Sequence, residues 1–174
     1  MSEIHLTIDG IALPIDWAGD LSADDEHVGG FSFVQMADGS QVYQEAWKKR
    51  RLSLQGRCLR PPALEGVDWV GGFELGWIHP DGIVQASNVF TIPAARRSDA
   101  WILAFANVER YGVVAAEPAA VSVVGNTATV TVVTGALSYS VHWFPLITMR
   151  GQRPRVTHDI NAGVFNFALE AQEV

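Results

Sequence analysis

Apolar and polar residues alternate along most of the chain, which is the period of half-buried β-strands. Phe31 and Phe33 share one face of a predicted strand. Asp38-Gly39 follows and predicts a hairpin turn, because both residues tolerate positive φ. The return strand runs from Gln41 to about Gly56. The pattern therefore predicts an antiparallel hairpin between about residues 31 and 56.

The same alternation continues toward the C-terminus. It predicts strands at 4–8, in a hairpin over 73–92, in a hairpin over 121–133, at 137–143 and at 164–169. The polar segment 150–159 is expected to be a loop, and 63–68 to form one helical turn. About ten short strands separated by turn signals, with no long helix, favour an all-β fold. We expect an antiparallel β-barrel or sandwich.

The length of 174 residues suits one compact unit with a substantial core. Within it, residues 1–97 and 150–174 are expected to form a β-barrel core. Residues 98–149 are expected to form an inserted β-hairpin lobe on that core.

The composition is 48% hydrophobic and only 18% charged, which excludes an intrinsically disordered chain. So little charge favours an apolar surface that is partly covered by other proteins; a large core is the alternative. The net charge of −7 argues against a nucleic-acid partner.

Residues 1–10 do not resemble a signal peptide, and no apolar run reaches the roughly 18 residues of a membrane helix. The single Cys58 cannot form an internal disulfide, which suits a reducing compartment. We expect a protein made in a cytoplasm, without a membrane anchor.

Candidate catalytic groups are few. No hydrolase, nucleotide-binding or zinc-protease motif is present. His142, the His158-Asp159 pair and Cys58 are more simply non-catalytic residues than parts of an active site. The acidic residues Asp20 and 24–26 lack calcium-loop spacing and are expected in a solvated turn. The sequence therefore predicts no enzyme activity, cofactor or metal site.

Two further features suggest surfaces for binding. The basic run 48–51 favours a salt-bridging interface or protection of an edge strand, because nucleic-acid binding would need more basic and aromatic residues. Trp101, Tyr139 and Trp143 in the inserted lobe are candidates for binding a sugar or another cell-surface group. A carbohydrate-binding or host-surface-binding β module is thus the alternative function.

The first half of the chain resembles the small distal-tail and baseplate proteins at the tail tip of long-tailed bacteriophages. The segments that carry the resemblance are Ile8-Asp9-Gly10, Gly29-Gly30-Phe31-Ser32-Phe33, Met36-Ala37-Asp38-Gly39, Gln44 to Arg50, Leu52 to Gly56 and Pro61 to Asp68. It covers mainly residues 1–92 and more loosely 155–174, and none of its motifs is catalytic. Residues 98–149 have no counterpart in it.

The resemblance implies a barrel of the distal-tail type and a structural role in the virion. Such proteins form a homo-oligomeric ring, here expected to be a hexamer, that joins the tail tube to the hub or fibres. Asp24, Asp25 and Glu26 of one subunit are expected to meet a basic strand of the next. That strand would contribute Trp47, Lys49 and Arg51.

Overall fold

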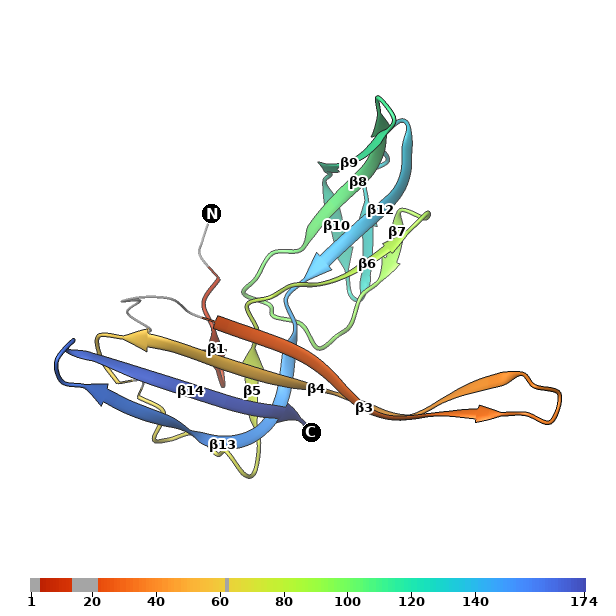
Figure 1. Cartoon of the computed structure of the whole chain (residues 1–174). Coiled ribbons are helices and arrows are strands. Elements are labelled where there is room, and N and C mark those ends of the chain that lie inside the picture. Colours follow the sequence, from red (N-terminus) through yellow and green to blue (C-terminus); the bar gives the residue numbers. More distant parts are fainter. Residues whose placement is uncertain (1–3, 14–21, 62) are drawn as a thin grey trace. The chain divides into compact units, whose positions relative to one another are not determined.

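The computed structural model describes residues 4–13, 22–61 and 63–174 (Figure 1). These residues form fourteen β-strands and no helix. The strands pair antiparallel, and the sheets are open, so the all-β prediction is confirmed whereas no closed barrel forms. The chain divides into two compact units, which we call unit 1 (1–10 and 75–147) and unit 2 (11–74 and 148–174).

Unit 1 contains two sheets. The first has the order β6 (Asp81–Gln85), β12 (Ala136–Trp143), β8 (Leu103–Arg110) and β9 (Val113–Pro118), and the second the order β10 (Val121–Val124), β11 (Thr127–Val130) and β7 (Val89–Thr91). One buried cluster comes from strands of both sheets: Phe90, Ile92, Ala104, Ala106, Val108, Ala128, Val130, Tyr139, Val141 and Trp143. The strands β6 and β7, predicted to belong with 1–97, therefore pair with strands of the 98–149 segment.

The N-terminal strand of unit 1 is held by a buried arginine. β1 (Thr7–Ile8) pairs with β5 (Phe73–Gly76), with Thr7 opposite Gly76. Arg97 is 6% exposed, and its Nη1 donates to the carbonyl oxygens of His5 at 2.6 Å and of Gly76 at 3.1 Å. The same guanidinium forms an ion pair with Asp99. Arg97 thus satisfies backbone carbonyls from two separate segments.

Unit 2 contains a sheet with the order β13, β14, β4 and β3. Their bounds are β13 (Leu146–Asp159), β14 (Val164–Glu173), β4 (Gln41–Cys58) and β3 (Ser22–Gln35); the short β2 (Ile11–Ala12) precedes them. Alternate residues of β4, including Leu52, Leu54 and Cys58, are buried, as are Phe167 and Leu169 of β14. The residues between them are mostly exposed, so this sheet has an inner apolar face and an outer polar face.

Two local predictions were wrong. Residues 150–159, predicted to be a loop, form most of β13 and pair with β14 as far as Asp159 opposite Val164. Their polarity is explained by exposure, since most of these side chains are exposed. Residues 63–68 contain a turn in place of the expected helical turn.

Candidate functional site

The hairpin of β3 and β4 extends past the end of the sheet that anchors it. β14 pairs with β4 only from Arg51 to Cys58, whereas β3 pairs with β4 as far as Gln35 opposite Gln41. Residues 29–48 therefore form a two-stranded ribbon, which Figure 1 shows extending beyond β14. We call this segment the ribbon. In the described part of the chain, its strands pair only with each other.

The tip of the ribbon is the predicted Asp38-Gly39 turn. Gly39 has φ +84°, and its N–H donates to the carbonyl oxygen of Met36 at 2.9 Å. One carboxylate oxygen of Asp38 accepts hydrogen bonds from the N–H and hydroxyl of Ser40. These hydrogen bonds hold the pKa of Asp38 below its ordinary value. The turn prediction is confirmed.

One face of the ribbon carries three aromatic rings in mutual contact. Phe33 lies directly opposite Tyr43, and Phe31 precedes Phe33 by two residues on the same face. The ring centroids are 5.4 Å apart for Phe33 and Tyr43, 6.0 Å for Phe31 and Tyr43, and 6.3 Å for Phe31 and Phe33. Their exposed fractions are nevertheless 63%, 65% and 52% for Phe31, Phe33 and Tyr43. We call these residues the aromatic cluster.

The opposite face of the ribbon is also apolar in part. Val34 lies opposite Val42, and both are about two-fifths exposed. Met36 at the tip is half exposed. An exposed contiguous apolar patch on a soluble protein marks an interaction site. The ribbon, with exposed apolar residues on both faces, is therefore the candidate interaction surface of unit 2.

The base of the ribbon is shaped by two glycines and a tryptophan. The register between β3 and β4 shifts between Gly30 and Phe31. A Cβ at Gly30 would lie 2.6 Å from Nε1 of Trp47, and one at Gly29 would lie 2.6 Å from the carbonyl oxygen of Trp47. Gly30 therefore lets the Trp47 indole lie against the β3 backbone, and Gly29 lets the Trp47 carbonyl group approach that backbone closely. Trp47 remains 47% exposed.

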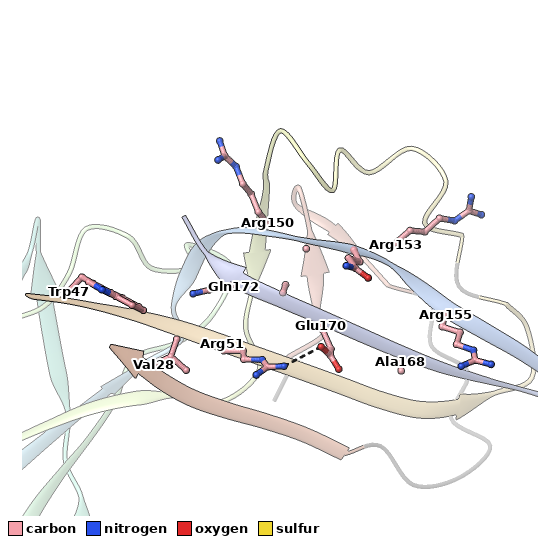
Figure 2. A pocket seen from close by; sticks show the side chains of 12 residues that line it. Val28, Trp47, Arg51, Arg150, Arg153, Arg155, Ala168, Glu170 and Gln172 are labelled. Atoms are coloured by element: carbon pink, nitrogen blue, oxygen red, sulfur yellow. Dashed lines mark hydrogen bonds and ion pairs between the residues drawn. The ribbon is translucent and has the colours of Figure 1, made fainter. Parts of the chain in front are cut away.

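Beside the base of the ribbon, a groove crosses the outer face of the unit 2 sheet. Trp47 and Val28 line one part of it, and its charged lining residues are Arg51, Arg150, Arg153, Arg155 and Glu170. Figure 2 shows Arg51 on β4 and the other three arginines along β13. We call these four lining residues the arginine face, of which Arg51 and Arg155 lie on the side of the sheet that carries Glu170. The Arg150 and Arg153 side chains point away from that side.

The arginine face is only partly neutralised. Arg51 forms an ion pair with Glu170 at 3.3 Å, and Arg153 forms one with Glu65, which lies outside the groove lining. Nε of Arg150 donates to the carbonyl oxygen of Gly71 at 3.4 Å. Arg155 forms no ion pair with any residue that the structure describes. On the side that carries Glu170, Arg155 is therefore the arginine whose charge no described carboxylate offsets.

The acidic and basic segments predicted to join neighbouring subunits lie side by side within one chain. Asp24, Asp25 and Glu26 are in strand β3, not in a turn, and Glu26 lies opposite Arg51. Oδ1 of Asp25 is 3.3 Å from Nε of the largely buried Arg50. Lys49 is half-buried. Part of the charge assigned to an inter-subunit contact is thus used internally.

The three aromatic residues proposed to bind sugars do not form a surface platform. Tyr139 and Trp143 are buried in the unit 1 core, with exposed fractions of 6% and 5%. The hydroxyl of Tyr139 accepts a hydrogen bond from the N–H of Val133 at 3.2 Å. Trp101 is half-buried and contacts Phe144 edge to face. These positions remove the observation that favoured a sugar-binding lobe.

The cysteine and histidines considered as catalytic candidates lie in packing contacts. Cys58 is 1% exposed, and its Sγ contacts the carbonyl oxygen of Phe165. His158 stacks on Phe165 with the ring planes 11° apart, and His142 contacts Phe105. Asp20 lies outside the described residues. Among the residues described, no three His, Cys, Asp or Glu side chains gather as a metal site would require, and none of the segments is a membrane-spanning helix.

Comparison with family models, with curated proteins and with solved structures gives no match to this chain. The ribbon and the arginine face are therefore the two features from which a function can be inferred. Sequence analysis missed the aromatic cluster, although Phe31 and Phe33 on one face and Val34 on the other indicated a strand with two apolar faces. It missed three arginines of the groove because it placed them in a loop.

Proposed function

We propose that this protein is a structural assembly subunit whose ribbon binds a neighbouring subunit. The observation that carries the proposal is the aromatic cluster: three rings in mutual contact, each more than half exposed, on a ribbon that other described strands do not cover. Aromatic residues are enriched at the buried centres of protein interfaces. The cluster therefore has the composition of an interface anchor.

The energetics favour covering this surface. Complete burial of one large apolar side chain is worth roughly 1.5–3 kcal/mol. Covering three largely exposed rings thus contributes several kcal/mol toward the cost of association. An isolated two-stranded hairpin is marginally stable in water, so docking on a neighbour also stabilises the ribbon itself.

The biological setting that we propose is the tail tip of a long-tailed bacteriophage. This part rests on the sequence resemblance of residues 1–92, which implies an oligomeric ring between the tail tube and the hub or fibres. A ring needs one heterologous contact that repeats around an axis. A projecting ribbon suits such a contact because it is separate from the surface that receives it.

The experiment compares the mass of the full-length protein with that of a Phe33→Ser/Tyr43→Ser variant by sedimentation velocity. The wild type should sediment as an oligomer and the variant as a monomer, with unchanged thermal unfolding of the sheets. Val124→Ser is the matched control, because Val124 is 77% exposed on β10, which belongs to unit 1 and not to the ribbon. A monomeric wild type, or a variant that assembles like the wild type, would refute the proposal.

The tail-tip setting has its own test. Antibodies against the protein, labelled with gold, should mark the end of the tail in electron micrographs of intact phage particles. Labelling of the head or along the tail tube would refute this setting without affecting the role of the ribbon.

A further inference from the structure

We propose that the ribbon of one copy lies in the groove formed by the arginine face of the next copy. This inference rests on the proposed function and names the surface that receives the ribbon. Both surfaces belong to unit 2, so each chain presents one ribbon and one groove.

The charges of the two surfaces are complementary. The ribbon (29–48) contains two acidic residues, Asp38 and Glu45, and one basic residue, Lys48 at its base. On the side of the groove that carries Glu170, the lining has Arg51, which is paired with Glu170, and Arg155, which has no ion-pair partner among the described residues. The two carboxylates of the ribbon and the Arg155 guanidinium of the groove attract each other, and this attraction also fixes the orientation of docking.

The chemistry of the facing groups also matches. Glu45 lies opposite Phe31, so the ribbon presents a carboxylate on the same face as the aromatic cluster. A guanidinium group stacks on aromatic rings and pairs with carboxylates. Arg155 has no ionic partner among the described residues, and Trp47 and Val28 provide an apolar wall to the groove. The groove thus offers partners for both the rings and the carboxylate.

The occupant of the groove must come from another molecule. The ribbon consists of the continuing strands β3 and β4, which pair from the sheet outward to Gln35 opposite Gln41, with one register shift between Gly30 and Phe31. To reach the groove of its own chain, the ribbon would have to fold back and break that pairing. Docking between different surfaces of two copies is a head-to-tail contact, which generates a closed ring or a filament.

Cross-linking between single cysteines tests this arrangement. In a Cys58→Ala background, Gln41→Cys places a thiol on the aromatic face of the ribbon, and Gln152→Cys places one in the groove. A short bismaleimide cross-linker should give covalent dimers when the two variants are mixed, but not with either variant alone. Thr127→Cys, on an exposed position of β11, replaces the groove cysteine as the control.

The outcomes separate this inference from the proposed function. Oligomers without mixed dimers, or with dimers from Gln41→Cys alone, would overturn groove docking while leaving ribbon-mediated assembly in place. A chain that stays monomeric at every concentration would overturn both.

A charge reversal gives an independent measurement. Arg155→Glu should raise the concentration for half-assembly at least tenfold, whereas Arg57→Glu, an exposed reversal outside the groove, should leave it nearly unchanged. Unchanged assembly of Arg155→Glu would overturn the inference. A second measurement is the binding of poly-glutamate to both proteins. If Arg155→Glu assembles like the wild type but binds poly-glutamate less well, the groove serves an acidic partner other than a second copy, and the inference is again overturned.

Discussion

Phe33 of β3 lies directly opposite Tyr43 of β4, with ring centroids 5.4 Å apart, yet each side chain is more than half exposed. A cross-strand aromatic pair stabilises the hairpin that contains it. The same pair also presents apolar surface outward. One contact therefore both stabilises the ribbon and provides its binding surface.

The Arg97 hydrogen bonds predict a large loss of stability on substitution. In Arg97→Met, the carbonyl oxygens of His5 and Gly76 would lose a charged donor in a buried position. We expect the free energy of unfolding to fall by about 2–4 kcal/mol. Urea denaturation followed by circular dichroism measures this change.

The control for this prediction is Arg110→Met. Arg110 is exposed and pairs with Glu117 across β8 and β9. Exposed ion pairs contribute little, so this variant should unfold like the wild type. Equal effects of the two substitutions would show that Arg97 has no special structural role.

Asp99 predicts an acid-sensitive contribution to stability. Its hydrogen bonds with Arg97 hold its pKa below the ordinary value of 3.8. The folded state thus favours the ionised carboxylate, and the stabilisation is fully present at pH values well above the unfolded pKa of 3.8 and is lost as the pH falls through the folded pKa. Melting temperatures between pH 2.5 and 6 should fall less steeply for Asp99→Asn than for the wild type. Parallel curves would contradict this assignment.

The unit 2 sheet leaves no room for a side chain at Gly151. A Cβ at this position would lie 2.4 Å from the carbonyl oxygen of Glu170 and 3.1 Å from Cα of Ala171, both backbone atoms that cannot move away alone. Gly151→Ala should therefore destabilise the protein by roughly 1–3 kcal/mol. Gly66→Ala, with no atom near its Cβ, should have little effect in the same thermal assay.

The thiol of Cys58 should not react with thiol reagents in the folded protein. It is 1% exposed on the inner face of β4, so a reagent such as Ellman's reagent cannot reach the sulfur. One thiol should react in denaturant and none within minutes in native buffer. Rapid reaction of the native protein would show that the inner face of the sheet opens readily.

Much of the fold was predictable because alternation and turn chemistry are local properties. Asp38-Gly39 and Gly125-Asn126 mark turns where the structure has them, and Gly125 has φ +58°. The segment 150–159 failed because its strand is mostly exposed, so polarity was mistaken for a loop. The division into units also depends on long-range pairing, such as that of β6 with β12, which local patterns do not encode.

The site was less predictable for the same reason. Alternation indicates that Phe31 and Phe33 share a face, but not that β14 pairs with β4 only as far as Arg51 and leaves that face uncovered. Likewise, buried Tyr139 and Trp143 look no different in sequence from exposed aromatic residues. Exposure is decided by which strands become neighbours, and the sequence pattern does not specify those neighbours.

Hydrogen–deuterium exchange at low and high protein concentration tests the central claim most directly, because it reads the ribbon amides themselves. The account predicts that peptides covering residues 29–48 exchange much more slowly at the high concentration, while peptides from β10 and β11 exchange equally at both. Exchange of the ribbon peptides that does not depend on concentration, in a sample shown to be oligomeric, would contradict the account.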